Sequence, residues 1–124
     1  PQDIALLDAR KGLRMFEKVE VPVLGVIENM SSYHCPECGF EAPIFGHGGG
    51  ELMAHADNVP FLGEMPLDIR IRQRVDAGIP TLAEDPDSEL SIRYRWMALR
   101  AVARLGTTGK DYSRLFPNIV VENS

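Results

Sequence analysis

The chain has 124 residues, and 13 lysines and arginines against 18 aspartates and glutamates give it a formal net charge of −5. With 44% hydrophobic and 25% charged residues, it has the composition of a globular domain with a single core. The mild acidity argues against binding to nucleic acid or to an anionic membrane, and no apolar run is long enough to span a bilayer. The N-terminus shows no signal-peptide pattern. We therefore expect a cytoplasmic protein without nucleic-acid or membrane partners.

Two units of a helix followed by a strand are predicted in the first half of the chain. Helical spacing of apolar and small residues indicates a helix over Asp3–Val19, and the apolar segment Val21–Ile27 follows as a strand. A second helix over Gly50–Ala56 precedes Val59–Gly63, which repeats the Val-Pro-x-Leu-Gly pattern 38 residues later. Strands that are apolar on both faces are typical of parallel sheets covered by helices. We therefore expect an α/β fold, with the chain forming part of a doubly wound parallel sheet with flanking helices.

Two further helices are expected after the second strand, over residues 68–77 and 89–105. We assign residues 1–106 to one α/β domain with a cysteine-containing loop at 31–45, and residues 107–124 to a C-terminal tail. Because the chain opens at Pro1 directly into a helical pattern, we interpret it as a piece of a longer protein. The apolar positions of the first and last helices predict their packing faces: Ala5, Ala9, Gly12, Leu13 and Phe16 in the first, and Leu90, Tyr94, Met97, Leu99, Ala101 and Leu105 in the last.

The only two cysteines, Cys35 and Cys38, form a Cys-x-x-Cys motif in a loop that also contains Pro36 and Gly39. A structural disulfide does not suit a core-rich chain of cytosolic type. A thioredoxin-like redox pair would open a helix after a strand, whereas these thiols lie in a Gly/Pro loop. The remaining interpretation is a metal site, holding either zinc or an iron–sulfur cluster, and both prefer four soft ligands.

One chain does not offer a complete set of such ligands. The spacing from Cys38 to His47 and on to His55 does not match that of zinc-finger ligands, and His34 adjoins Cys35 directly. We therefore predict that two chains each contribute Cys35 and Cys38 to a shared four-cysteine site on the two-fold axis of a homodimer.

Polar residues at the ends of the predicted strands are candidates for ligand contacts, because ligands of parallel α/β sheets bind beyond the carboxyl edge. Asn29 follows the first strand and can either read a base edge or cap a loop. Asp68 follows the second strand and can instead cap the next helix. The glycine-rich segment Gly46–Gly50 is not a P-loop, because Glu51 follows it where a P-loop needs Lys-Ser/Thr.

Taken together, four segments resemble the C-terminal half of the Mrp/ApbC family of iron–sulfur cluster carriers, within the MinD/Mrp group of P-loop ATPases. The resemblance covers roughly residues 1–80 with order and spacing intact, and it is specific in the combination of its motifs rather than in any one of them. The segments are Val23–Ser31, with its Glu-Asn-Met-Ser motif, Cys35–Gly39, Ile44–Gly50 and Val59–Asp68.

The resemblance implies a homodimer joined through the CxxC loop, in which Cys35 and Cys38 share a labile [4Fe-4S] cluster for delivery to apo iron–sulfur proteins. It also implies that Asn29 contacts the adenine of ATP, with Pro66, Leu67 and Asp68 alongside the nucleoside. The family's Walker A lysine and Walker B aspartate lie upstream of the segment that resembles this chain. We therefore expect the longer protein to use ATP and Mg²⁺ as an ATPase, and this chain alone to be inactive.

Two other functions fit parts of the sequence. A zinc-bridged structural or interaction module without carrier activity would use the same cysteine ligands, so the sequence does not separate it from a carrier. A partitioning ATPase acting on membranes or DNA is disfavoured, because no basic amphipathic tail follows the last helix.

Overall fold

The computed structural model describes residues 1–108, so predictions for residues 109–124 lie outside the described part of the chain. The tail expected from residue 107 therefore falls almost entirely outside it, and Thr107 is the last residue of a helix. In chain order the elements are α1 (Asp3–Lys18), β1 (Val26–His34), β2 (Glu41–Ala42), α2 (Gly49–Ala56), β3 (Phe61–Leu67), α3 (Ile69–Asp76), α4 (Thr81–Glu84) and α5 (Glu89–Thr107).

The three strands form one sheet in the order β2-β1-β3. β1 and β3 are parallel, with Val26 opposite Phe61 and Asn29 opposite Met65, as the repeated helix–strand pattern predicts. β2 is antiparallel to β1, and the sequence did not predict it. The fold is therefore α/β with a small mixed sheet and flanking helices, and a doubly wound sheet remains a prediction.

The bounds predicted for both strands were wrong. β1 begins at Val26 rather than Val21, because the backbone N–H of Val26 donates to the carbonyl of Pro60 at 2.8 Å, where pairing with β3 starts. Within residues 1–108, the segment 21–25 belongs to no strand. β1 then continues to His34 because both β3 and β2 pair with its second half, and β3 itself runs on to Leu67.

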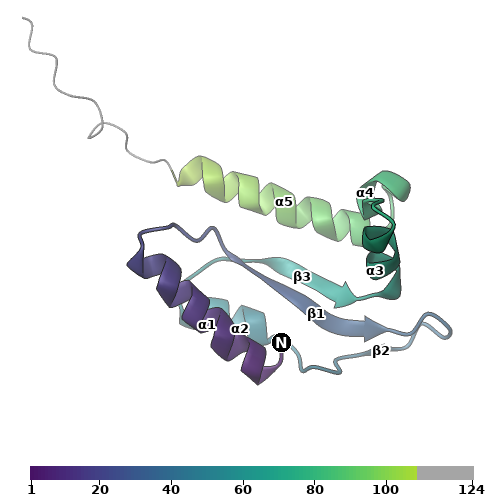
Figure 1. The fold of residues 1–124 in the computed structure, drawn as a ribbon, viewed down its shortest axis with the longest axis horizontal. Helices are drawn as coiled ribbons and strands as arrows, with labels where there is room; N and C mark the ends of the chain where they lie inside the picture. Colours follow the sequence, from purple (N-terminus) through teal and green to yellow (C-terminus); the bar gives the residue numbers. More distant parts are fainter. Residues whose placement is uncertain (109–124) are drawn as a thin grey trace, which may run out of the picture.

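Helices lie on both sides of the strand pair (Figure 1). α5 packs along β3, where Met65 of the strand and Leu90 and Met97 of the helix form a buried cluster. On the other side α2 packs against β1, and α1 is attached to α2. Two arginines of α1 make that attachment: Arg10 and Arg14 hold the Asp57 carboxylate at 3.1 and 2.9 Å.

The predicted packing faces of the first and last helices are only partly buried. In α1 only Leu13 is buried, and Phe16 is exposed. In α5, Leu90 and Met97 are buried, whereas the predicted Leu99 and Leu105 are about 60% exposed. The apolar pattern is correct, but within residues 1–108 no element covers these positions. No helix in this part of the chain is long and apolar enough to cross a membrane.

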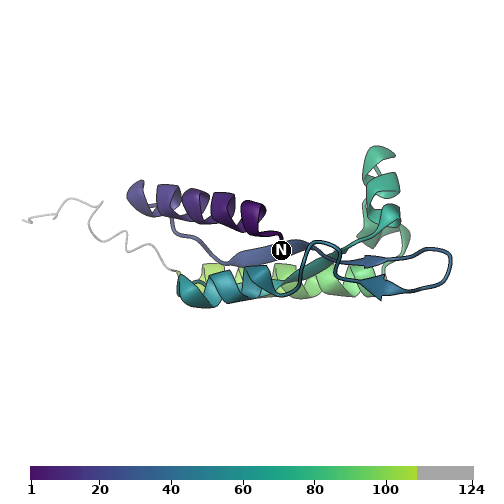
Figure 2. The same ribbon diagram turned by 90° about the horizontal axis from the view of Figure 1, so that it is seen from below.

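Both parallel strands point their carboxyl ends toward the same end of the molecule. There the loop between β1 and β2 projects beyond the sheet, next to α3 and α4, in both views (Figures 1 and 2). α3 begins directly after β3, and the Asp68 carboxylate caps it by accepting from the N–H of Arg70 at 2.8 Å. The fold thus places the cysteine loop and the first turn of α3 together.

Candidate metal centre

The cysteine motif occupies a tight turn between two paired strands. The segment expected as one loop over 31–45 contains strand at 31–34 and at 41–42, so the turn itself is residues 35–40. The N–H of Cys35 donates to Phe40 O, and the N–H of Gly39 donates to Cys35 O, both at 2.9 Å. Gly39 has a φ of +71°, which glycine adopts without strain. The pairing of β1 with β2 therefore fixes the two ends of the turn, while the middle of the turn projects from the sheet.

Both cysteines are free, and they differ in exposure. Cys35 is half-buried and Cys38 is exposed. The pKa of the Cys35 thiol is lowered, first by the backbone N–H of Cys38, then by that of Glu37 and by a hydrogen bond with the Cys38 thiol. The two sulfurs therefore lie on one side of the turn. Because the thiolate is the form that binds metals, the turn favours ligation by Cys35.

The remaining ligands of a four-coordinate site are not found nearby. Within residues 1–108, no group of three or more His, Cys, Asp or Glu side chains could hold a metal ion. His34 Nε2 lies 3.2 Å from Glu41 Oε1 across the β1–β2 pair, and His47 and His55 are exposed. The described residues therefore fit two of the four ligand positions that zinc or an iron–sulfur cluster prefers.

A cavity of about 300 Å³ separates the cysteine turn from the start of α3. One wall comes from the end of β1 and the turn, and the other from the residues that cap and open α3. Its lining residues are His34, Cys35, Pro36, Gly39, Asp68, Ile69 and Arg70.

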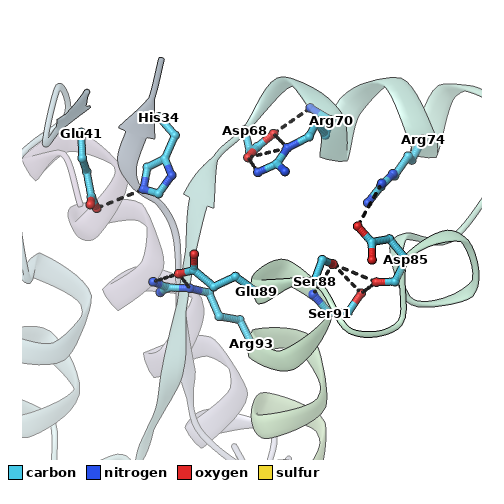
Figure 3. Close-up of polar contacts among 10 residues, drawn as sticks. All are labelled: His34, Glu41, Asp68, Arg70, Arg74, Asp85, Ser88, Glu89, Ser91 and Arg93. Carbon is cyan, nitrogen blue, oxygen red and sulfur yellow. Dashed lines mark hydrogen bonds and ion pairs between the residues drawn. The ribbon is translucent and has the colours of Figure 1, made fainter. Parts of the chain in front are cut away.

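The Asp68–Arg70 ion pair and the contact between His34 and Glu41 flank this cavity (Figure 3). Arg70 Nε donates to both oxygens of Asp68, at 2.9 and 3.1 Å, and this pairing lowers the pKa of Asp68 against the opposing effect of burial. On the other side, hydrogen bonds from Ser32 and then from His34 lower the pKa of Glu41. Both carboxylates are therefore held in the ionised form beside the cysteine turn.

The residues predicted to contact a nucleotide lie within β1 and at the end of β3 but differ in accessibility. Asn29 is exposed and lies opposite Met65, which immediately precedes Pro66. Asn29 lies inside β1 rather than after the first strand as expected, and its Oδ1 accepts from the N–H of the next residue, Met30, at 3.0 Å. Pro66 and Asp68 are buried and Leu67 is half-buried. The structure thus brings Asn29 close to residues 66–68, and their contact with a nucleotide stays a prediction.

Two residues that sequence reasoning missed contribute to this part of the molecule. Glu28, 4% exposed, accepts from the N–H of Gly50 and so ties β1 to the first turn of α2. A carboxylate inside an apolar strand was a signal that could have indicated this role. Arg70 lines the cavity next to Cys35. No sequence signal separates it from the other arginines of α3.

The fold and the site define an α/β protein that presents a free Cys-x-x-Cys pair on a hairpin at the carboxyl end of its parallel strands. Comparison with known proteins gives the family. A family model described as NUBPL iron-transfer P-loop NTPase, of the ParA group, matches residues 1–102. The chain belongs to this family, and the resemblance to iron–sulfur cluster carriers is confirmed.

The names of similar proteins agree with this family. The chain is 52% identical over 110 residues to an "Iron-sulfur cluster carrier protein" of Escherichia coli (strain K12), covering 89% of this chain and 30% of the relative. It is 44% identical over 105 residues to the "Iron-sulfur cluster transfer protein NUBPL" of Mus musculus, covering 85% and 33%. The Dictyostelium discoideum protein of the same name is 37% identical over 123 residues, covering 98% and 38%. The chain thus spans about a third of the length of these relatives.

Proposed function

We propose that this chain is the C-terminal part of a cytoplasmic, ATP-dependent iron–sulfur cluster carrier. In this proposal two copies share one labile [4Fe-4S] cluster through Cys35 and Cys38 and transfer it to apo iron–sulfur proteins. The observation that carries the proposal is the free cysteine pair on a projecting hairpin, with no further ligand set within residues 1–108. The names of the relatives support the carrier role, and two free thiols suit the reducing cytoplasm.

The geometry also suits release of the cargo. A cluster bound by two thiolates from each of two subunits loses half of its protein ligands when the subunits separate. Cys38 is exposed at the tip of the turn, so an acceptor's thiolate can approach it and replace it. Ligand exchange of this kind needs no change in the oxidation state of iron, because one thiolate replaces another.

The nucleotide part of the proposal concerns the neighbouring sheet edge. Asn29 would contact the adenine, with Pro66, Leu67 and Asp68 beside the nucleoside, and ATP and Mg²⁺ would bind only in the longer protein. Asn29 lies within β1 rather than beyond its end, so support comes from its position opposite Met65, directly before the residues that end β3. β1 contains Asn29 and ends at His34, directly before the cysteine turn, so one strand connects the two sites.

Anaerobic reconstitution with iron and sulfide tests the cluster. We expect a brown, air-sensitive dimer with about two iron and two sulfide ions per chain, as one [4Fe-4S] cluster shared by two chains requires. Cys35→Ser and Cys38→Ser should each abolish the colour, whereas Glu37→Gln, an exposed change in the same turn, should retain it. A colourless dimer that binds zinc tightly and takes up no iron would instead support the zinc-bridged module.

Transfer to an apo-acceptor tests the ATP dependence in the longer protein. Rates measured with ATP and with a non-hydrolysable analogue should differ if hydrolysis drives loading or release. Equal rates would contradict nucleotide gating while leaving cluster binding intact. An Asn29→Ala variant should weaken ATP binding without changing the iron content, because Asn29 lies apart from the cysteine turn on β1.

A further inference from the structure

The cavity beside Cys35 is bounded on its far side by Arg70, to which sequence reasoning gives no role. Cys35 and Gly39 line one wall of this space, and Asp68, Ile69 and Arg70 line the other. The turn and α3 stand at the same end of the molecule in both views (Figures 1 and 2), and the shared cavity places Cys35 beside the first turn of α3.

The guanidinium of Arg70 is held in place by Asp68. Its Nε and Nη2 donate to the Asp68 carboxylate, and in Figure 3 the arginine folds back over this residue. Asp68 is 6% exposed and also caps α3, so it provides a fixed anchor. In the hydrogen bonds found within residues 1–108, Nη1 of Arg70 has no acceptor. The pair therefore ties the guanidinium beside the cavity, while about half of the Arg70 side chain stays exposed and Nη1 remains able to donate.

We propose that Arg70 is a positioning residue for the iron–sulfur cluster, donating from Nη1 to a sulfur of the cluster or of its thiolate ligands. This inference rests on the function proposed above. A cluster bound by four thiolates is anionic, and Arg70 is the arginine that lines the cavity beside Cys35, together with the carboxylate of Asp68. Hydrogen bonds to the sulfurs and nearby positive charge are the means by which a protein stabilises such a cluster and raises its reduction potential.

The experiment compares Arg70→Gln with Arg72→Gln in the reconstituted chain. Arg72 is an exposed arginine of the same helix that pairs with Asp76 at 3.3 Å and does not line the cavity. We expect Arg70→Gln to lose iron to a chelator roughly three- to tenfold faster than the unmodified protein, as loss of one hydrogen bond predicts. Its reduction potential should also shift downward. Arg72→Gln should match the unmodified protein in both measurements.

The variant Arg70→Lys separates the effect of the positive charge from the effect of the hydrogen-bond geometry. It also provides a second test if Arg70→Gln does not fold. A lysine keeps the positive charge, but it lacks the several N–H groups with which arginine binds Asp68 and donates to a second acceptor at the same time. We therefore expect rates of iron loss and reduction potentials between those of the unmodified protein and those of Arg70→Gln. If the unmodified protein binds a cluster and every Arg70 variant equals Arg72→Gln in both measurements, the role of Arg70 is refuted and the carrier function is untouched. If the unmodified protein and Cys35→Ser both take up no iron, the proposed function itself fails.

Discussion

At the scale of single residues, Asp68 combines a helix cap with an ion pair. Its carboxylate accepts from the backbone N–H of Arg70 and from the guanidinium, and the pairing lowers its pKa. A group whose pKa is lowered on folding adds stability above its unfolded pKa, near 4, and loses that contribution as the pH falls through the folded pKa. Asp68 should therefore stabilise the fold at neutral pH and cease to do so in acid.

The variant Asp68→Asn tests this prediction, because asparagine is a comparable N-cap and only the charge is removed. We expect the free energy of unfolding to fall by about 1 kcal/mol at pH 7, as for a charge-assisted pair with a half-exposed partner. The difference from the unmodified protein should close as the pH falls below the unfolded pKa, near 4, and through the lowered pKa of Asp68. Denaturant titrations at a series of pH values measure it, with the exposed Asp76→Asn as control. A difference that stays constant down to acid pH would contradict the assignment.

Asp68 also shows what a sequence can and cannot predict about one side chain. A short polar residue directly before a helix has few local partners, so the helix-cap alternative followed from position alone, and the structure shows the cap. The partner of a long arginine depends on what lies several ångströms away in the fold. Arg70, Arg72 and Arg74 of α3 therefore look alike in sequence, although only Arg70 reaches the cavity beside Cys35.

At the scale of elements, the contact between β3 and α5 depends on Gly63. Its φ of +149° is one that residues with a side chain rarely adopt, and an added Cβ would lie 2.8 Å from Cγ of the buried Met97. We predict that Gly63→Ala lowers the free energy of unfolding by about 1–3 kcal/mol, because both the backbone and the packing must adjust. Thermal or denaturant unfolding measures the loss.

Gly12→Ala serves as the matched control for this substitution. Gly12 lies inside α1, and an added Cβ there meets no atom within 4 Å. The same change should therefore stabilise the helix by about 0.5–1 kcal/mol, because alanine has the higher helix propensity. If both variants shifted stability in the same direction by the same amount, the packing argument for Gly63 would be wrong.

The attachment of α1 to α2 depends on Asp57, which follows α2. Its side chain is 7% exposed and binds Arg10 and Arg14 together. We predict that Asp57→Asn speeds amide hydrogen exchange in α1 while leaving exchange in α5 unchanged, because α1 buries only Leu13 and depends on this link. Asp8→Asn, in an exposed pair with Lys11, is the control that should change neither helix. Equal exchange in all three proteins would show that the ion pairs do not hold α1.

Element type was easier to predict than element bounds. The apolar run Val21–Ile27 indicated a buried strand, and a strand parallel to β3 exists, but it begins at Val26 where its partner begins. An apolar pattern reports which residues favour burial, whereas strand bounds depend on where the neighbouring backbone lies. The two-residue β2 shows the same limit, because Glu41 and Ala42 carry no strand signal of their own. α5 was predicted closely, because its Ser88 cap and its periodicity are local features.

At the scale of the whole molecule, apolar helix faces remain uncovered within residues 1–108. Ile4 and Leu7 of α1 and Leu99 and Val102 of α5 are each more than half exposed. Helical periodicity predicted where such faces lie but not what covers them, because burial depends on partners that are distant in the sequence. The same reason limited the prediction of the metal site. The sequence indicated two ligands, and within residues 1–108 the structure shows no cluster of His, Cys, Asp or Glu that completes the set.

If two chains share one metal, as we propose, metal binding and dimer formation should occur together. Each chain fills two positions of a tetrahedral site, so zinc added to the metal-free protein should bind at about one ion per two chains and double the mass in solution. Light scattering at several protein concentrations measures the mass, and a colorimetric zinc assay measures the ratio. The zinc-loaded mass should persist on dilution to concentrations at which the metal-free protein is monomeric, because metal bound only by the dimer stabilises it by mass action.

Two chains could also associate through the exposed apolar faces of α1 and α5. A double Cys35→Ser, Cys38→Ser variant separates this association from a metal-bridged dimer. Contact between apolar faces does not involve the thiols, so such a dimer would form equally in the variant and would not respond to zinc. A metal-bridged dimer would disappear in the variant at every zinc concentration. Should the unmodified protein bind one zinc ion per monomer with no rise in mass, one chain would suffice to hold the metal, and the two-chain site would be refuted.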